Sequence, residues 1–82
     1  RECRVRLLME NSLAGVVIDR FGKDVSLVPV DEEHFAVNVD VYLSSQFLHW
    51  IFALGDGAKI VGPQEVVEEA KREIRRLTEQ YR

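Results

Sequence analysis

The sequence has few of the residues that metal sites, disulfides and redox centres need. It contains one cysteine, Cys3, and two histidines, His34 and His49, among 82 residues. A single cysteine excludes an internal disulfide, and iron–sulfur clusters need about four cysteines. The two histidines are widely separated and show no zinc-ligand spacing. We therefore expect no metal and no cofactor.

Long apolar runs and an excess of basic residues are also absent. No apolar stretch approaches the roughly 18 residues that span a bilayer, and no signal-peptide pattern opens the chain. The formal net charge of -3 argues against this domain being the main nucleic-acid-binding surface. Because a lone cysteine also fits a reducing compartment, we expect a soluble cytoplasmic domain without membrane contact.

Motifs for catalysis are missing as well. Gly55 and Gly57 fit neither the Walker pattern nor GxGxxG, and a strand-like segment follows them, so we interpret them as turn glycines. His34 stands in an acidic turn and His49 on a helical segment, where each is typical of a surface residue. Acid–base or nucleophilic catalysis needs an activated group beside its partner, and no such pair is evident. We predict that the chain is not an enzyme.

The composition that remains is that of one folded domain. Hydrophobic residues make up 46% of the chain and charged residues 30%, which is typical of a globular sequence. Eighty-two residues leave room for a single domain, residues 1–82. Since the chain begins at Arg1 and strand-like sequence follows within two residues, we expect it to be a fragment of a longer protein.

Alternation of apolar and polar residues predicts four strands. The two clearest cover residues 2–9 and 35–42. Shorter strands are expected over residues 25–30 and 58–61. Pro29 lacks an N–H group, which places the second strand at an edge of the sheet.

Helical spacing of apolar residues predicts three helices, over residues 13–21, 45–54 and 63–81. The expected N-caps are Asn11 or Ser12 for the first helix and Ser44 or Ser45 for the second. Pro63 is expected at the first position of the third helix, where its missing N–H would have no partner. The expected helix stops are Gly22 and Gly55.

The resulting order is βαββαβ followed by a helix. Short connections and right-handed crossovers then favour a four-stranded antiparallel sheet covered by two helices. The predicted fold class is α+β, a ferredoxin-like plait with an additional C-terminal helix. An enzyme of the acylphosphatase type, built on a similar plait, would need an arginine-bearing loop at residues 10–12, which Glu10-Asn11-Ser12 does not offer.

The additional helix carries an apolar stripe that the plait does not need. Its members are Val66, Val67, Ala70, Ile74, Leu77 and Tyr81. The stripe can pack on its own sheet and helices, or part of it can pack on a second subunit or on an upstream domain. For the second case the candidate interface is Ile74, Leu77 and Tyr81, together with Trp50, which we otherwise assign to packing.

Four polar residues of the long strands form a candidate effector face. Arg4 and Arg6 alternate with buried positions, and the plait would bring Asn38 and Asp40 beside them. The face is either an ordinary solvated sheet surface, a surface covered by the last helix, or a pocket for an anionic effector or single-stranded nucleic acid. Asp40 would partly neutralise the arginines.

From Phe35 onward the sequence resembles a known family. The residues that carry the resemblance are Phe35-Ala-Val-Asn-Val-Asp-Val, Ser45, Phe47, Trp50-Ile51, Leu54-Gly55, Ala58-Lys-Ile60, Pro63 and Val66. They look like the C-terminal extension (WCX) domain that follows the WYL domain in bacterial WYL-type transcriptional regulators. The family often has a proline after the serine that opens the second helix, whereas Ser45 follows Ser44 here.

This resemblance implies a regulatory role. It implies an upstream winged helix-turn-helix domain that binds DNA, an upstream WYL domain that senses ligands such as nucleic acid, and this plait as a module for homodimerisation and effector response. The rival prediction is a plait that binds a small ligand or single-stranded nucleic acid through Arg4, Arg6, Asn38 and Asp40.

Overall fold

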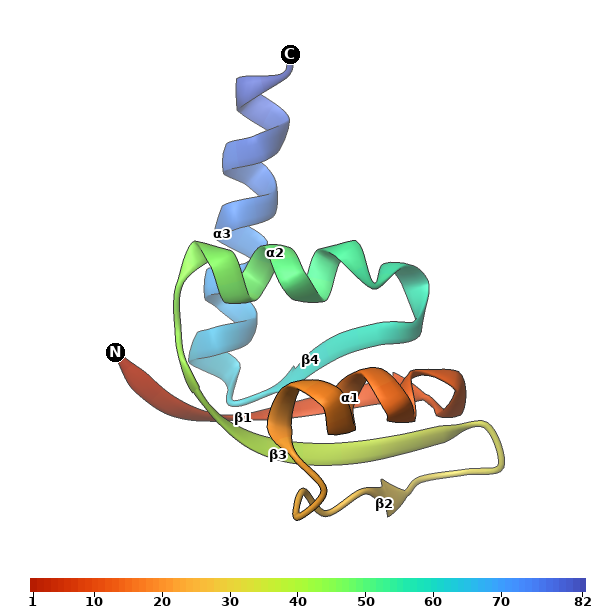
Figure 1. Ribbon diagram of the computed structural model, residues 1–82. Coiled ribbons are helices and arrows are strands. Elements are labelled where there is room, and N and C mark those ends of the chain that lie inside the picture. Colours follow the sequence, from red (N-terminus) through yellow and green to blue (C-terminus); the bar gives the residue numbers. More distant parts are fainter.

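A four-stranded antiparallel sheet forms one layer of the domain, and two helices cover one of its faces (Figure 1). In this computed structural model, which describes residues 1–82, the strands are β1 (Glu2–Glu10), β2 (Val28–Pro29), β3 (His34–Tyr42) and β4 (Ala58–Gly62). The helices are α1 (Ala14–Phe21), α2 (Ser45–Ala53) and α3 (Gln64–Gln80), with 3₁₀ turns η1 (Asn11–Leu13) and η2 (Gly55–Gly57). The strand order is β2-β3-β1-β4 with antiparallel neighbours. The predicted α+β plait with an extra C-terminal helix is confirmed.

The core lies between the sheet and the helices. The inward residues of the two central strands alternate with more exposed ones, as period-two patterning requires, except that Ala36 is buried between Phe35 and Val37. The buried side chains of the strands are Val5, Leu7, Met9, Phe35, Ala36, Val37, Val39, Val41 and Ile60, and those of the helices are Val17, Phe47, Leu48, Ile51 and Val66. No polar or charged side chain is buried. Any chemistry therefore belongs to the surface.

Of the two predicted helix caps, one is confirmed and the other is wrong. The hydroxyl of Ser44 accepts a hydrogen bond from the Phe47 N–H at 3.2 Å, so the cap of α2 is confirmed. The cap predicted for the first helix is wrong, because α1 begins at Ala14 after a 3₁₀ turn and has no side-chain cap. Asn11 instead donates its side-chain amide to the Glu32 carbonyl at 2.9 Å. It ties η1 to the turn between β2 and β3.

Two segment boundaries also differ from the prediction. The strand expected over residues 25–30 contains only Val28 and Pro29. Val30 follows it and donates its N–H to the His34 carbonyl at 2.9 Å. β2 does lie at the sheet edge, as the proline indicated. Pro63 has an extended backbone with ψ of 168° and serves as the N-cap, so α3 begins one residue later than predicted.

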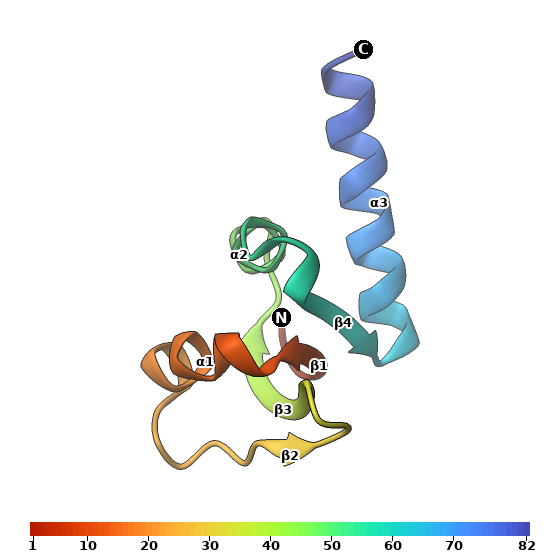
Figure 2. The same cartoon turned by 90° about the vertical axis from the view of Figure 1, so that its right-hand side faces the viewer.

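α3 stands beside β4 and runs past α2, so that its C-terminal end projects from the rest of the domain (Figure 2). Val66 in its first turn is completely buried. Farther along, Ile74 is 50% exposed and Tyr81 is 82% exposed. The helix therefore packs on its own domain at its start and much less at its end. No helix of the chain has the length and apolar character that crossing a membrane would require.

Candidate functional site

The candidate effector face is assembled as the strand pattern predicted. β1 and β3 pair so that Arg4 lies opposite Asp40 and Arg6 lies opposite Asn38. These four residues are exposed on the sheet face that α1 and α2 leave open. α3 does not cover them, because the side chains of Arg4 and Asp40 are 70% and 71% exposed. Of the sequence-based alternatives, coverage by the last helix is therefore wrong.

Arg4 and Asp40 already bind each other through two hydrogen bonds. The guanidinium donates from Nε at 3.0 Å and from Nη2 at 3.2 Å to the two oxygens of the carboxylate. These hydrogen bonds, and then the nearby positive charge, lower the pKa of Asp40 below its ordinary value. The same contacts raise the pKa of Arg4. An exposed pair of this kind has little net charge to offer a ligand.

Arg6 is the cation on this face that has no carboxylate partner. It lies opposite Asn38 on β3, and no salt bridge or side-chain hydrogen bond joins it to another residue. Tyr42, near the end of β3, is 70% exposed and is the large aromatic of this face. An arginine and an exposed aromatic ring can hold a phosphate and a base. Arg4, Arg6 and Asn38 line no hollow, whereas Asp40 and Tyr42 border one of about 660 Å³.

The four candidate interface residues do not form one surface. Trp50 lies between α1 and α2, where its ring meets Phe21 edge-on at 5.8 Å and the Arg20 guanidinium stands 4.4 Å from the ring centroid. Ile74 and Leu77 instead face a groove on the other side of α2, and Tyr81 lies at the exposed end of α3. The sequence alone could not separate these positions, because helical spacing does not tell which neighbour each face meets.

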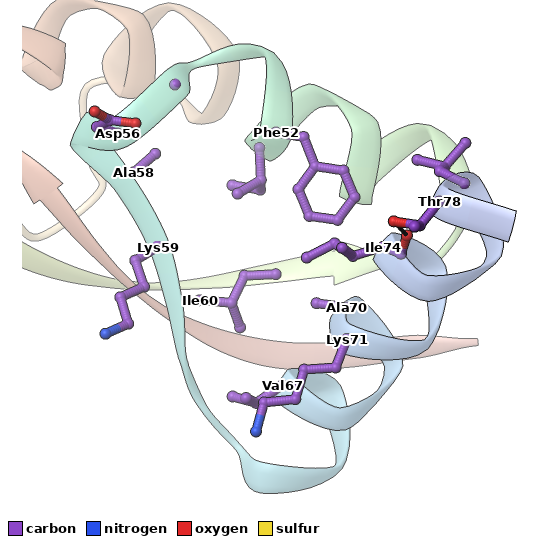
Figure 3. Close-up of a pocket in the computed structure, with 13 residues that line it drawn as sticks. Phe52, Asp56, Ala58, Lys59, Ile60, Val67, Ala70, Lys71, Ile74 and Thr78 are labelled. Carbon is purple, nitrogen blue, oxygen red and sulfur yellow. Dashed lines mark hydrogen bonds between the residues drawn. The ribbon is translucent and has the colours of Figure 1, made fainter. Parts of the chain in front are cut away.

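Sequence analysis missed a groove between α2, β4 and α3 (Figure 3). Its volume is about 640 Å³. Its apolar wall is made by Ile51, Phe52, Ala58, Ile60, Val67, Ala70, Ile74 and Leu77. The amphipathic stripe of α3 was a signal for one wall. The groove itself exists because α3 leaves the domain at an angle after its first turns.

A polar cluster on the other flank of α3 holds this helix to α2. Glu73 accepts hydrogen bonds from Arg76 on its own helix and from His49 Nε2 on α2. The hydrogen bonds from Arg76 and then from His49 lower the pKa of Glu73 to about 2. Arg1 adds a contact from the start of the chain, donating to Glu69 at 2.8 Å. His49 therefore links two helices, a role that its spacing did not reveal.

The other histidine, His34, is the first residue of β3 and adjoins the acidic turn in which the sequence analysis placed it. His34 Nδ1 donates to Asp31 at 2.9 Å, and this hydrogen bond raises the pKa of the imidazole. The two histidines thus make separate surface hydrogen bonds to carboxylates.

Comparison with known proteins agrees with this architecture. A family model described as the WCX domain matches residues 1–78. A comparison with curated proteins finds no match. The matched residues run from β1 almost to the end of α3, and the WCX family is one of regulators and not of enzymes. The chain therefore belongs to the WCX domain family, the C-terminal modules of WYL-type transcriptional regulators.

Proposed function

We propose that this domain is the regulatory and dimerisation module of a WYL-type transcriptional regulator, and that it is not an enzyme. It pairs two subunits along α3, with the exposed apolar side chains of the C-terminal half of the helix at the contact. It relays the binding of an effector to a winged helix-turn-helix domain, which lies outside residues 1–82 and binds DNA. The regulator acts in the cytoplasm. Membership of the WCX family supports the regulatory role.

The observation that carries the pairing is the exposed apolar stripe of α3. Ile74 is 50% exposed and Tyr81 is 82% exposed, although both lie on the apolar side of a strongly amphipathic helix. A contiguous apolar stripe on a helix that projects into solvent is typical of a protein–protein contact.

Charge along α3 favours a second copy of the chain as the partner. Residues 64–70 contain three glutamates and no basic residue, whereas residues 71–82 contain five basic residues and two glutamates. In an antiparallel two-fold pair the acidic half of each α3 would lie opposite the basic half of the other. Apolar contact along the stripe and opposite charges on its flanks would then act together.

Sedimentation equilibrium of residues 1–82 at several concentrations tests this proposal. We expect a reversible monomer–dimer equilibrium that Ile74→Ser weakens. Val30→Ser is the matched control, because Val30 is 54% exposed and lies in the turn before β3, away from α3. A monomer at every concentration, or equal weakening by both variants, would contradict pairing through α3.

The second candidate function is binding of a small anion or single-stranded nucleic acid on the open sheet face. Arg6, which has no carboxylate partner, and the exposed Tyr42 favour it. Titration with nucleotides and short single-stranded DNA would detect such binding, and Arg6→Ala should then abolish it. Lys23→Ala is the control, since Lys23 is exposed in the loop after α1. Unchanged binding in Arg6→Ala would remove this candidate.

A further inference from the structure

The groove between α2, β4 and α3 has the size of a small-molecule site. Its volume of about 640 Å³ falls within the roughly 300–1,000 Å³ that drug-sized ligands occupy. A whole helix, about 10 Å across, would need a longer and wider trough. Size therefore favours a small ligand over a docked helix as the occupant.

The wall of the groove is apolar along its length. Ile60 of β4 and Phe52 of α2 face Ile74 of α3 across it (Figure 3). These side chains offer no hydrogen bonds, and the hydroxyl of Thr78 is already used, since it donates to the Ile74 carbonyl at 2.9 Å. A ligand portion that lies here must be hydrocarbon, because a polar group would lose its water without gaining a partner.

Charge is confined to the rim, and most of it is positive. Lys59 and Lys71 carry ammonium groups, and both point away from the Phe52 ring in the close-up (Figure 3). Lys59 makes no salt bridge, and Lys71 has only a 3.4 Å contact with the exposed Glu68. Their long stems keep both ammonium groups in water at the edge of the groove. Asp56 is the one carboxylate of the lining.

We propose that this groove binds a small amphiphilic anion, namely an alkyl chain that ends in a single carboxylate. The chain lies between Ile60, Phe52 and Ile74, and the carboxylate stays at the rim beside Lys59 and Lys71. The binding is noncovalent and reversible.

This inference names a class of effector for the proposed regulatory module, and its regulatory meaning rests on that proposed function. Ile74 and Leu77 belong both to the groove and to the proposed pairing stripe. A bound alkyl carboxylate and a second subunit would therefore compete for the same side chains.

Calorimetric titration of residues 1–82 with hexanoate, octanoate and decanoate tests the binding. We expect the dissociation constant to fall about fourfold for each added methylene until the groove is filled. Octylammonium should bind more weakly than octanoate. Amide shifts in an NMR spectrum should map to β4 and α3 and not to the open sheet face.

Variants distinguish binding in the groove from nonspecific adsorption of an alkyl chain to the protein surface. Ile74→Ser should weaken octanoate binding about five- to tenfold, because it removes part of the apolar wall. Lys59→Gln and Lys71→Gln should each weaken it about two- to fivefold, as expected for exposed ion pairs. Lys23→Gln is the control of the same charge change and should have no effect.

The inference is overturned if octanoate does not bind, if octylammonium binds as tightly as octanoate, or if Lys23→Gln matches the groove variants. Its failure differs from failure of the proposed pairing, which is measured by sedimentation without ligand. A protein that forms the dimer, yet binds no carboxylate even when it is diluted to the monomer, would contradict only the inference. A monomer that binds octanoate in the groove would contradict only the pairing.

Discussion

Replacing Val66 by alanine tests whether the apolar packing of α3 on its own domain is concentrated in the first turns of the helix. Val66 is completely buried, whereas Ile74 lies on the same stripe of the helix and is 50% exposed. If the C-terminal half of α3 is free in the isolated subunit, truncation at these two positions must have very different costs.

The magnitudes follow from what each side chain buries. Val66→Ala removes two methyl groups, worth about 1.6 kcal/mol by transfer, and the cavity that remains raises the loss in the free energy of unfolding to about 2–3 kcal/mol. Ile74→Ala removes more carbon, but half of that surface already meets water, so we expect a loss of about 1 kcal/mol. In a domain of this size, Val66→Ala should lower Tm by roughly 10–20 °C.

Urea unfolding followed by circular dichroism at low micromolar protein gives both values. The low concentration keeps the subunits apart, so that pairing does not contribute to the stability measured. If Ile74→Ala costs as much as Val66→Ala under these conditions, α3 packs along its whole length on its own domain. A pairing stripe that is free in the isolated subunit would then be excluded.

Three further outcomes are expected from the same assay. Ser44→Ala should cost about 1 kcal/mol through loss of the α2 cap, whereas Ser45→Ala should have little effect. Gly22→Ala should cost about 1 kcal/mol, because Gly22 has a φ of 93° that a residue with Cβ rarely adopts. The pKa of Glu73 is lowered to about 2, so the stability it contributes is present above its unfolded pKa of about 4.5 and is lost as pH falls toward 2. Glu73→Gln should therefore flatten the decline of Tm between pH 5 and pH 2, and Glu79→Gln, which changes an exposed glutamate on the same helix, should leave that decline unchanged.

Local sequence patterns predicted the strands and helices correctly where one local physical effect dominates. The alternation in residues 35–42 specified a strand with one buried face, and the hydroxyl of Ser44 specified a helix start. Prediction failed where a longer-range contact outcompeted the local one. Asn11 had the chemistry of a cap, but the Glu32 carbonyl, 21 positions away, takes its amide.

In the candidate site, too, contacts that follow from local patterns were predictable and contacts that depend on helix packing were not. The meeting of Arg4 with Asp40 followed from period-two spacing plus the strand order of the plait, both of which could be inferred from the sequence. The linkage of His49 to Glu73 could not be inferred, because it depends on how two helices cross.

The sequence by itself determined the fold class, the two faces of the sheet and the presence of an amphipathic final helix, because the periods of strands and helices are local properties of the chain. Only the tertiary structure decided the direction in which α3 leaves β4 and therefore which residues of its stripe stay uncovered. That direction depends on the simultaneous packing of Val66 on the core and of Glu73 on α2. A groove with three walls follows from it, and no single segment of the sequence contains that information.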